Sequence, residues 1–191
     1  MRLSIIGAGQ IGQALADKWQ AVGHNVAIGV RSPSADVVRA RTVDVDEALK
    51  RDVVVLAIPG GAVDDFLAAH SQQLTNTLLI DATNSVGGSV MHHAAAAAGV
   101  EGLRYARAFN SLGVENIVTP SIGGVSLDMF YSCPEADQEI VASLIADVGF
   151  TPVWVGEGQQ AADVIDGVTR LWFALAMGRG MGRHLGFRVL T

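Results

Sequence analysis

Short apolar runs alternate with amphipathic stretches through the first part of the chain. The apolar runs have the length of β-strands and lie at residues 3–6, 26–30, 53–58 and 78–80. Stretches compatible with helices separate them, at residues 13–22, 35–39, 44–50 and 62–71. Near-continuous apolar strands alternating with helices are typical of a parallel sheet covered on both faces. The pattern predicts an α/β fold with a doubly wound, mainly parallel sheet.

The second half of the chain continues with more widely spaced elements. Further strands are expected at residues 104–109, 128–132 and 152–155, with a helix at residues 135–148. A long helix follows, in which apolar residues recur at helical spacing on one face. These residues are Val164, Ile165, Val168, Leu171, Trp172 and Leu175. The chain is therefore expected to end in a C-terminal helical extension.

The first apolar run ends in a glycine motif, Gly7-Ala8-Gly9-Gln10-Ile11-Gly12, just where a helix begins. In such a motif Gly7 permits a tight turn, Gly9 lets a pyrophosphate approach the backbone, and Gly12 allows the helix to pack closely on the strand. The free N–H groups at the helix N-terminus also favour phosphate. The position between strand and helix predicts a dinucleotide-binding Rossmann domain at residues 1–157, with residues 158–191 as a helical segment packed on it or on a partner subunit.

The end of the second strand bears on which dinucleotide is bound. Sites selective for NAD usually carry an acid about 20 residues after the motif, but here the strand leads into Arg31 and Ser32, and no acid comes before Asp36. Because a guanidinium can bind a phosphate bidentately, Arg31 and Ser32 favour NADP. Arg39 and Arg41 would add positive potential. The alternative is that Arg31 is a solvated loop residue and that the site accepts either cofactor.

Composition and charge exclude several classes of protein. The chain has 191 residues, of which 50% are hydrophobic, and a net charge of −6, which argues against a nucleic-acid surface. A single cysteine, Cys133, excludes an intrachain disulfide and a cysteine-rich metal site. No apolar run approaches the roughly 18 residues of a membrane span. A strand that begins at residue 2 leaves no room for a cleavable signal, so a cytoplasmic protein without membrane partners is expected.

Several polar residues lie where parallel strands end, which is where ligands bind in open α/β sheets. The loops at residues 59–61 and 81–84 are therefore candidate walls of a nicotinamide pocket. Asn110 and Ser111 follow a later strand, and either could hydrogen-bond the nicotinamide carboxamide or a substrate oxygen, or instead cap the next turn.

No metal site or catalytic residue emerges from the remaining motifs. His92 and His93 are adjacent, so on a helix they would not share a face, and no carboxylate is spaced to complete a metal site. Packed or solvated histidines are expected instead. Without a G-x-S-x-G elbow or an obvious Ser/His/Asp set, covalent hydrolysis has no support.

Taken together, these motifs resemble those of the short NADP-binding oxidoreductases related to the F420-dependent NADP reductases. The similarity extends over nearly the whole chain and is carried by the segments at residues 7–12, 29–32, 57–59, 81–84, 107–113 and 171–187. The chain departs from the family where Asn84 is followed by Ser85 rather than proline, and where Arg107 replaces a frequent lysine. It also lacks the Arg-Arg or Arg-x-x-x-Lys set that strong NADP binders of this group carry after the second strand, so Arg31 and Ser32 bear more of the case for NADP.

The resemblance implies hydride transfer between nicotinamide C4 and the C5 of a deazaflavin, which needs proximity and ring alignment more than a side-chain acid. It implies that the pyrophosphate lies on residues 8–11 and the nicotinamide against residues 58–59 and 108–110. The C-terminal helices would close the substrate side and form a homodimer. Motif and resemblance together give these candidate cofactor-binding residues: Gly7, Ala8, Gly9, Gln10, Ile11, Gly12, Arg31, Ser32, Ala57, Ile58, Pro59, Asn84, Ala108 and Asn110.

Three functions fit the sequence. The first is an NADP(H)-dependent oxidoreductase that exchanges hydride with a flavin-like or deazaflavin (F420) acceptor. The second is an NADPH-dependent reductase of a small imine or carbonyl substrate, although Lys18 and Lys50, the only lysines, lie in early helices and weaken a hydroxyacid version. The third is a non-catalytic NADP-binding sensor.

Overall fold

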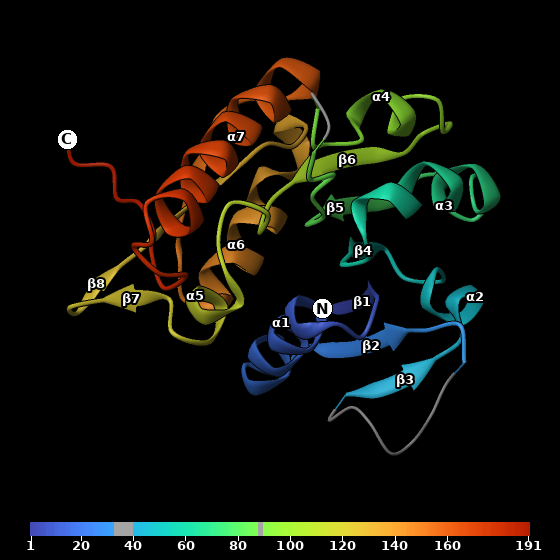
Figure 1. Ribbon diagram of the computed structural model, residues 1–191. Helices are drawn as coiled ribbons and strands as arrows, with labels where there is room; N and C mark the ends of the chain where they lie inside the picture. The colour runs from blue at the N-terminus through green and yellow to red at the C-terminus, as the bar shows by residue number, and fades with distance from the viewer. Residues whose placement is uncertain (33–39, 88–89) are drawn as a thin grey trace.

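A six-stranded parallel sheet forms the centre of the computed structural model, which describes residues 1–32, 40–87 and 90–191 (Figure 1). Its strands follow the order β3-β2-β1-β4-β5-β6. They are β1 (Arg2–Ile6), β2 (Asn25–Gly29), β3 (Arg41–Val43), β4 (Val53–Leu56), β5 (Leu78–Asp81) and β6 (Arg104–Arg107). This is the strand order of doubly wound dinucleotide-binding sheets, so the predicted fold class is confirmed. The helix expected at residues 35–39, together with Asp36 and Arg39, lies outside the described residues.

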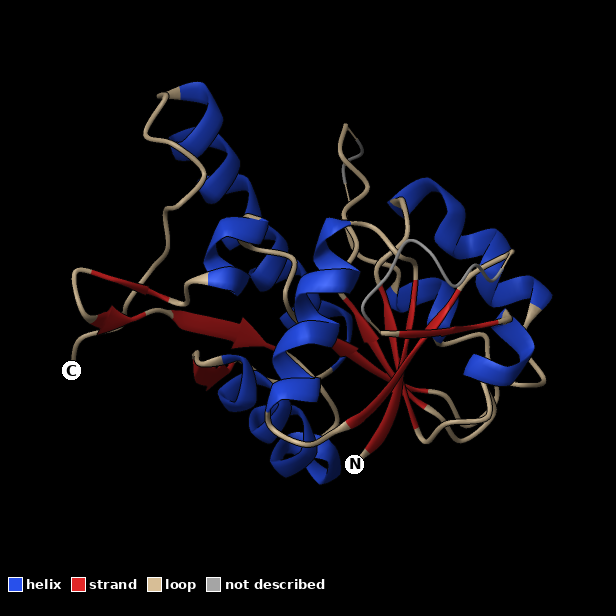
Figure 2. Cartoon of the chain, turned by 90° about the horizontal axis from the view of Figure 1, so that it is seen from below, coloured by secondary structure: helices blue, strands red, loops and turns tan. Residues whose placement is uncertain are grey.

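Helices cover both faces of this sheet (Figure 2). Those of the first half are α1 (Gln10–Ala21), α2 (Val45–Ala48), the 3-10 turn η1 (Gly60–Ala62), α3 (Val63–Ala69) and α4 (Ala94–Ala97). Those of the second half are α5 (Val114–Val118), the 3-10 turn η2 (Glu135–Asp137), α6 (Gln138–Val148), α7 (Gly158–Phe173) and the π-helical turn η3 (Ala174–Gly178). None of the helices in the described ranges is both long and apolar enough to cross a membrane.

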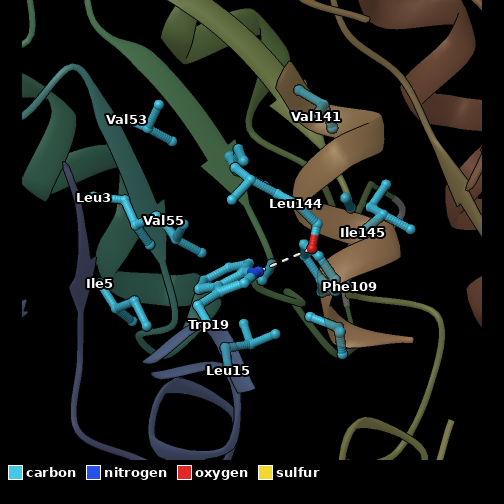
Figure 3. Close-up of a cluster of buried hydrophobic side chains, with 14 of the residues drawn as sticks. Leu3, Ile5, Leu15, Trp19, Val53, Val55, Phe109, Val141, Leu144 and Ile145 are labelled. Carbon is cyan, nitrogen blue, oxygen red and sulfur yellow. Dashed lines mark hydrogen bonds between the residues drawn. The ribbon is translucent and has the colours of Figure 1, made fainter. Parts of the chain in front are cut away.

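Successive strand residues point to opposite faces, so the sheet divides the core in two. On one face Leu3 and Ile5 pack with residues of α1 and α6. On the other face Ile6 and Leu56 pack with residues of α2, α3 and α4. Trp19 fills the first cluster: it is fully buried, and its indole Nε1 donates to the Leu144 carbonyl at 2.9 Å (Figure 3).

The sheet is extended by a second, smaller pair of parallel strands. These strands are β9 (Asp128–Tyr131) and β10 (Thr151–Trp154), which confirms the strands expected at residues 128–132 and 152–155. An antiparallel bridge between Arg107 and Ser132 joins the pair to β6. A short hairpin, β7 (Ser121–Ile122) and β8 (Val125–Ser126), was not expected from the sequence.

The C-terminal helix forms as expected but turns a different face inward. Ile165 and Trp172 are buried, whereas Val164 and Leu171 are 53% and 49% exposed, so the single apolar face predicted for this helix is wrong. The buried face instead includes two polar residues, Asp166 and Thr169. Helical structure ends at Gly178, and the tail beyond it returns to the sheet, where the Phe187 carbonyl accepts the N–H of Asp128 at 2.9 Å.

Candidate cofactor-binding site

The three glycines of the first motif have different surroundings. Gly7 has a φ of +113°, and a Cβ there would lie 2.5 Å from the Ala57 carbonyl oxygen, so both its conformation and its space require glycine. A Cβ on Gly12 would lie 2.2 Å from the Gly7 carbonyl oxygen. A Cβ on Gly9 would meet no atom within 4 Å. Two glycines are thus required by packing, and the third leaves open space in front of α1.

The N-terminus of α1 is well suited to an anion. Its N-cap residue, Gly9, offers no side-chain hydrogen bond, and the first turn contains no acidic residue. The first N–H groups of a helix have no partner within the helix and carry the positive end of its dipole. The Gln13 side chain donates to the Ala8 carbonyl at 2.6 Å and so braces the turn from behind. This arrangement is the one that binds pyrophosphate at a strand–helix crossover.

Arg31 and Ser32 emerge beside this turn. The Gly7 N–H donates to the Gly29 carbonyl at 3.1 Å, which holds the end of β2 against the glycine motif. Arg31 and Ser32 follow directly and are both exposed. Arg41 is paired with Glu47 at 2.7 Å, which offsets the positive potential expected from it. Among the described basic residues, Arg31 is therefore the one best placed to meet a 2′-phosphate.

The loops after β4 and β5 meet at the carboxyl edge of the sheet. Ala57 and Ile58 are half-buried and Pro59 is exposed. A Cβ on Gly60 would lie 2.6 Å from the Asn84 carbonyl and from the backbone nitrogen of Ser85, so the two loops touch through this glycine. The two segments predicted as walls of the nicotinamide pocket thus lie side by side.

The segment after β6 completes the same edge. Ala108 is fully buried, so its contact with a cofactor stays a prediction. Phe109 adopts a φ of +63°, the left-handed region that residues other than glycine rarely enter, as is common near functional sites. This turn presents Asn110 next to the loop of Asn84, whose Nδ2 donates to the Asn110 carbonyl at 2.8 Å.

The orientation of the Asn110 side chain is fixed by α7. Its Nδ2 lies 2.7 Å from the Thr169 hydroxyl, and that hydroxyl donates in turn to the Ile165 carbonyl at 3.1 Å. Thr169 therefore accepts from Asn110, which leaves Asn110 Oδ1 as a free acceptor. This oxygen is buried and has no hydrogen-bond partner among the residues that the structure describes. The helix that follows is capped by Gly113 without any side-chain bond, so Asn110 does not cap it, and contact between Asn110 and a ligand stays a prediction.

A buried charge cluster anchors α7 behind this edge. Arg107 is fully buried and lies 3.2 Å from Asp81 and 3.0 Å from Asp166. It also donates to Asn84 Oδ1 at 3.1 Å and to the Thr83 carbonyl. Both polar groups of the Asn84 side chain are thus engaged within the protein, so Asn84 holds the loop in place, and contact between its side chain and the cofactor stays a prediction.

Asp81 is held by further donors. The Tyr105 hydroxyl donates to Asp81 Oδ2 at 2.6 Å, and the backbone and hydroxyl of Thr83 donate to Oδ1 at 2.8 and 2.7 Å. Burial, and after it the charge of Asp81, raises the pKa of Tyr105 well above its ordinary value. The phenol therefore keeps its proton and remains a hydrogen-bond donor.

Sequence reasoning missed a Ser/His/Asp arrangement at this edge. The His93 ring lies 3.2 Å from the Ser85 hydroxyl and 2.8 Å from Asp64. His92 binds a different carboxylate, Asp163, at 3.0 Å, and both rings are buried. Within residues 1–32, 40–87 and 90–191, no three His, Cys, Asp or Glu side chains gather as a metal site would require. The only signal in the sequence was Ser85 at a position where the family often has proline.

Comparison with known families fits this geometry. Residues 2–85 match the family described as NADP oxidoreductase, coenzyme F420-dependent. The resemblance to the F420-dependent NADP reductases is confirmed. The match also confirms the predicted enzyme class, an NADP-dependent oxidoreductase. A comparison with curated proteins gave no significant match.

Solved structures share the fold of this NADP-dependent oxidoreductase. A protein from Arthrobacter sp. FB24, proposed to be an F420-dependent NADP reductase, matches it with a TM-score of 0.85 over 100% of both chains at 20% identity. A hypothetical protein from Sinorhizobium meliloti matches with a TM-score of 0.66 over 82% of this chain and 86% of its own, at 29% identity. An imine reductase from Myxococcus stipitatus, solved with NADP+, has a TM-score of 0.71 and 21% identity; the match covers 94% of this chain but only 63% of the imine reductase.

Proposed function

We propose that this oxidoreductase binds NADP(H) along the carboxyl edge of its sheet and exchanges hydride with a deazaflavin (F420) or flavin-like acceptor. The observation that carries the proposal is the open space at Gly9, in front of a helix N-terminus with no side-chain cap. Packing requires glycine at positions 7 and 12, whereas space for a ligand is what glycine provides at position 9.

Each part of the cofactor then has a counterpart in the chain. The pyrophosphate would lie on the backbone of residues 8–11, and the 2′-phosphate on Arg31 and Ser32. The nicotinamide would lie against residues 58–59 and 108–110. There the free Oδ1 of Asn110 would accept an N–H of the carboxamide, which satisfies a buried acceptor that otherwise has no partner among the described residues.

The acceptor is inferred from the chemistry and from the family. Bound NADPH supplies a hydride from its C4, and transfer to the C5 of a stacked deazaflavin depends on proximity and alignment. The chain would contribute a rigid floor, made of the touching loops after β4 and β5 and the turn at Phe109. The name of the matching family supports a deazaflavin as the partner in this transfer.

A second candidate function is the reduction of a small imine. It is favoured by the Ser85–His93–Asp64 arrangement, because a carbon–nitrogen double bond needs a proton as well as a hydride. An imine reductase also shares the fold.

The two candidates can be separated by one series of titrations and assays. NADPH and NADH are titrated by their fluorescence, and NADPH oxidation is then followed with the deazaflavin, a free flavin, a quinone and a cyclic imine. We expect tighter binding of NADPH and turnover with the deazaflavin. Binding without turnover on any acceptor would instead favour the sensor, and failure to bind either nucleotide would contradict the whole proposal.

A further inference from the structure

Three side chains from separate segments form a chain of hydrogen bonds that runs from the surface toward the proposed nicotinamide site. Ser85 lies in the loop after β5, His93 just before α4, and Asp64 in the first turn of α3. His93 Nε2 is 3.2 Å from the Ser85 hydroxyl, and His93 Nδ1 is 2.8 Å from Asp64 Oδ1. The His93 side chain is 8% exposed, whereas that of Asp64 is 72% exposed. The chain of hydrogen bonds therefore connects a solvated carboxylate to a half-buried hydroxyl.

The chemistry of the groups fixes which atoms carry protons. A carboxylate only accepts, so His93 Nδ1 carries a hydrogen toward Asp64. With a neutral ring, Nε2 accepts from Ser85. With a protonated ring, Nε2–H donates to Ser85, and the Ser85 hydroxyl is then free to donate its own proton elsewhere. Asp64 orients the ring, as the acid of a Ser/His/Asp triad does.

Surrounding groups hold the imidazole in place. The backbone N–H of His93 donates to the Tyr105 hydroxyl at 3.1 Å, and Tyr105 donates to Asp81. The Ser85 N–H donates to the Met91 carbonyl at 3.3 Å, which holds Ser85 beside the segment that leads to His93. The titratable groups facing His93 are thus Asp64 from α3 and Tyr105 from β6, with Asp81 behind Tyr105.

Ser85 also borders the proposed nicotinamide wall. Its backbone nitrogen is one of the atoms that a Cβ on Gly60 would meet at 2.6 Å, so it touches the loop after β4. The preceding residue, Asn84, binds the Asn110 carbonyl at 2.8 Å. Ser85 is therefore in direct contact with one wall of that pocket and one residue away from contact with another.

We propose that Ser85 is a proton donor to an imine substrate, resupplied by His93, whose ring Asp64 orients; this rests on the proposed binding of NADP(H) at the same edge. The imine carbon receives the hydride, with both electrons, from C4 of NADPH. The electron pair of the C=N double bond moves to nitrogen, which takes the proton from Ser85 Oγ, and Ser85 takes the proton of His93 Nε2. The products are an amine and NADP+, and solvent returns one proton to the imidazole after the amine leaves.

A pair of probe substrates tests this step. The neutral cyclic imine 3,4-dihydroisoquinoline needs both hydride and proton, whereas its N-methyl iminium salt becomes a tertiary amine on receiving hydride alone. The measured quantity is the ratio of kcat/KM on the imine to kcat/KM on the iminium. Positioned general acids contribute about 10²–10⁴-fold, so Ser85→Ala should lower this ratio by about 100-fold or more.

Matched variants separate proton donation from general damage. Ser143→Ala removes an exposed hydroxyl on α6 and should leave the ratio at the wild-type value. Ser85→Thr keeps a hydroxyl and should restore most of the ratio. Asp64→Asn should lower it by a smaller factor than Ser85→Ala. In D2O, the wild-type enzyme should show a solvent isotope effect on imine reduction but none on iminium reduction.

The remaining outcomes show whether the role of Ser85 fails alone or NADP(H) binding fails with it. An unchanged ratio in Ser85→Ala would overturn the role of Ser85. Turnover of the iminium or the deazaflavin by the wild-type enzyme, with none of the imine, would overturn the proton donor while leaving NADP(H)-dependent hydride transfer intact. If NADPH fails to bind at all, both proposals fall together.

Discussion

At the scale of single residues, Gly9 and Gly12 lie three positions apart in one motif, but glycine serves a different purpose at each. Gly12 packs against the Gly7 carbonyl, so its lack of a side chain serves the fold. Gly9 adopts an extended conformation that any residue can take, with φ −72° and ψ 179°, and a Cβ there would meet no atom within 4 Å. We propose that a bound ligand is the reason for its lack of a side chain.

This contrast predicts opposite effects for two substitutions. Gly9→Val should reduce NADPH affinity by at least tenfold with little change in Tm, because its side chain fills the space proposed for the pyrophosphate. Gly12→Ala should lower the free energy of unfolding by about 1–3 kcal/mol, the usual cost of overpacking. NADPH fluorescence titration and urea unfolding measure the two effects. A Gly9→Val variant that binds NADPH normally would remove the main support for the site.

Arg31 decides the proposed preference for NADP. Its guanidinium is exposed beside the glycine turn, and Arg41 is already paired with Glu47. Arg31→Ala should therefore weaken NADPH binding by about tenfold, which corresponds to about 1.4 kcal/mol, and leave NADH binding nearly unchanged. Arg2→Ala removes an exposed arginine at the opposite end of β1 and is the matched control. Equal affinities for the two nucleotides in the wild-type enzyme would refute this role for Arg31.

At the scale of elements, the strands and helices that could be predicted are those marked by a local pattern of apolar residues or glycines. β1, β2, β4 and β5 are mostly apolar, and the glycine motif after β1 marks the start of α1. β3 has three residues, Arg41–Val43, and no apolar run of its own; it forms because β2 offers it an edge to pair with. The face that α7 turns inward could not be predicted either, because it depends on Arg107, a buried arginine in β6.

The candidate site was predictable to a similar extent. Its glycine motif is contiguous, so spacing alone revealed it. Ser85, His93 and Asp64 come from three segments that only the tertiary structure brings together, and they follow no local spacing rule. The free acceptor on Asn110 likewise depends on Thr169, far along the chain in α7.

A substitution of the buried Arg107 tests whether its charge cluster anchors α7. Arg107→Met would leave Asp81 and Asp166 buried without their shared cation, and should lower the free energy of unfolding by about 3–5 kcal/mol. Arg41→Met breaks only an exposed ion pair and should cost about 1 kcal/mol or less. Urea unfolding of the two variants compares them directly. A similar small loss in both would show that the cluster does not anchor α7.

At the scale of the whole molecule, several large apolar side chains of the C-terminal region are exposed. Val164, Leu171, Met177 and Met181 are each about half exposed or more. Such side chains would be covered if the C-terminal regions of two chains packed against each other. We propose, as the sequence also led us to expect, that the enzyme is a homodimer formed through its C-terminal region.

Light scattering on a size-exclusion column tests the dimer. The wild-type chain of 19.9 kDa should elute with about twice its own mass, and Leu171→Glu with the mass of one chain, because the interface would bury an unpaired charge. Val22→Glu, at an exposed apolar residue after α1, should leave the mass unchanged. A wild-type protein of single-chain mass would contradict the proposal.

The central claim concerns where the cofactor lies, and a crystal structure of the enzyme with NADP+ tests it most directly. We predict the pyrophosphate within hydrogen-bonding distance of the backbone N–H groups at the start of α1, the 2′-phosphate beside Arg31, and the nicotinamide carboxamide on Asn110. A nucleotide bound elsewhere, or a glycine turn closed to it, would contradict the account.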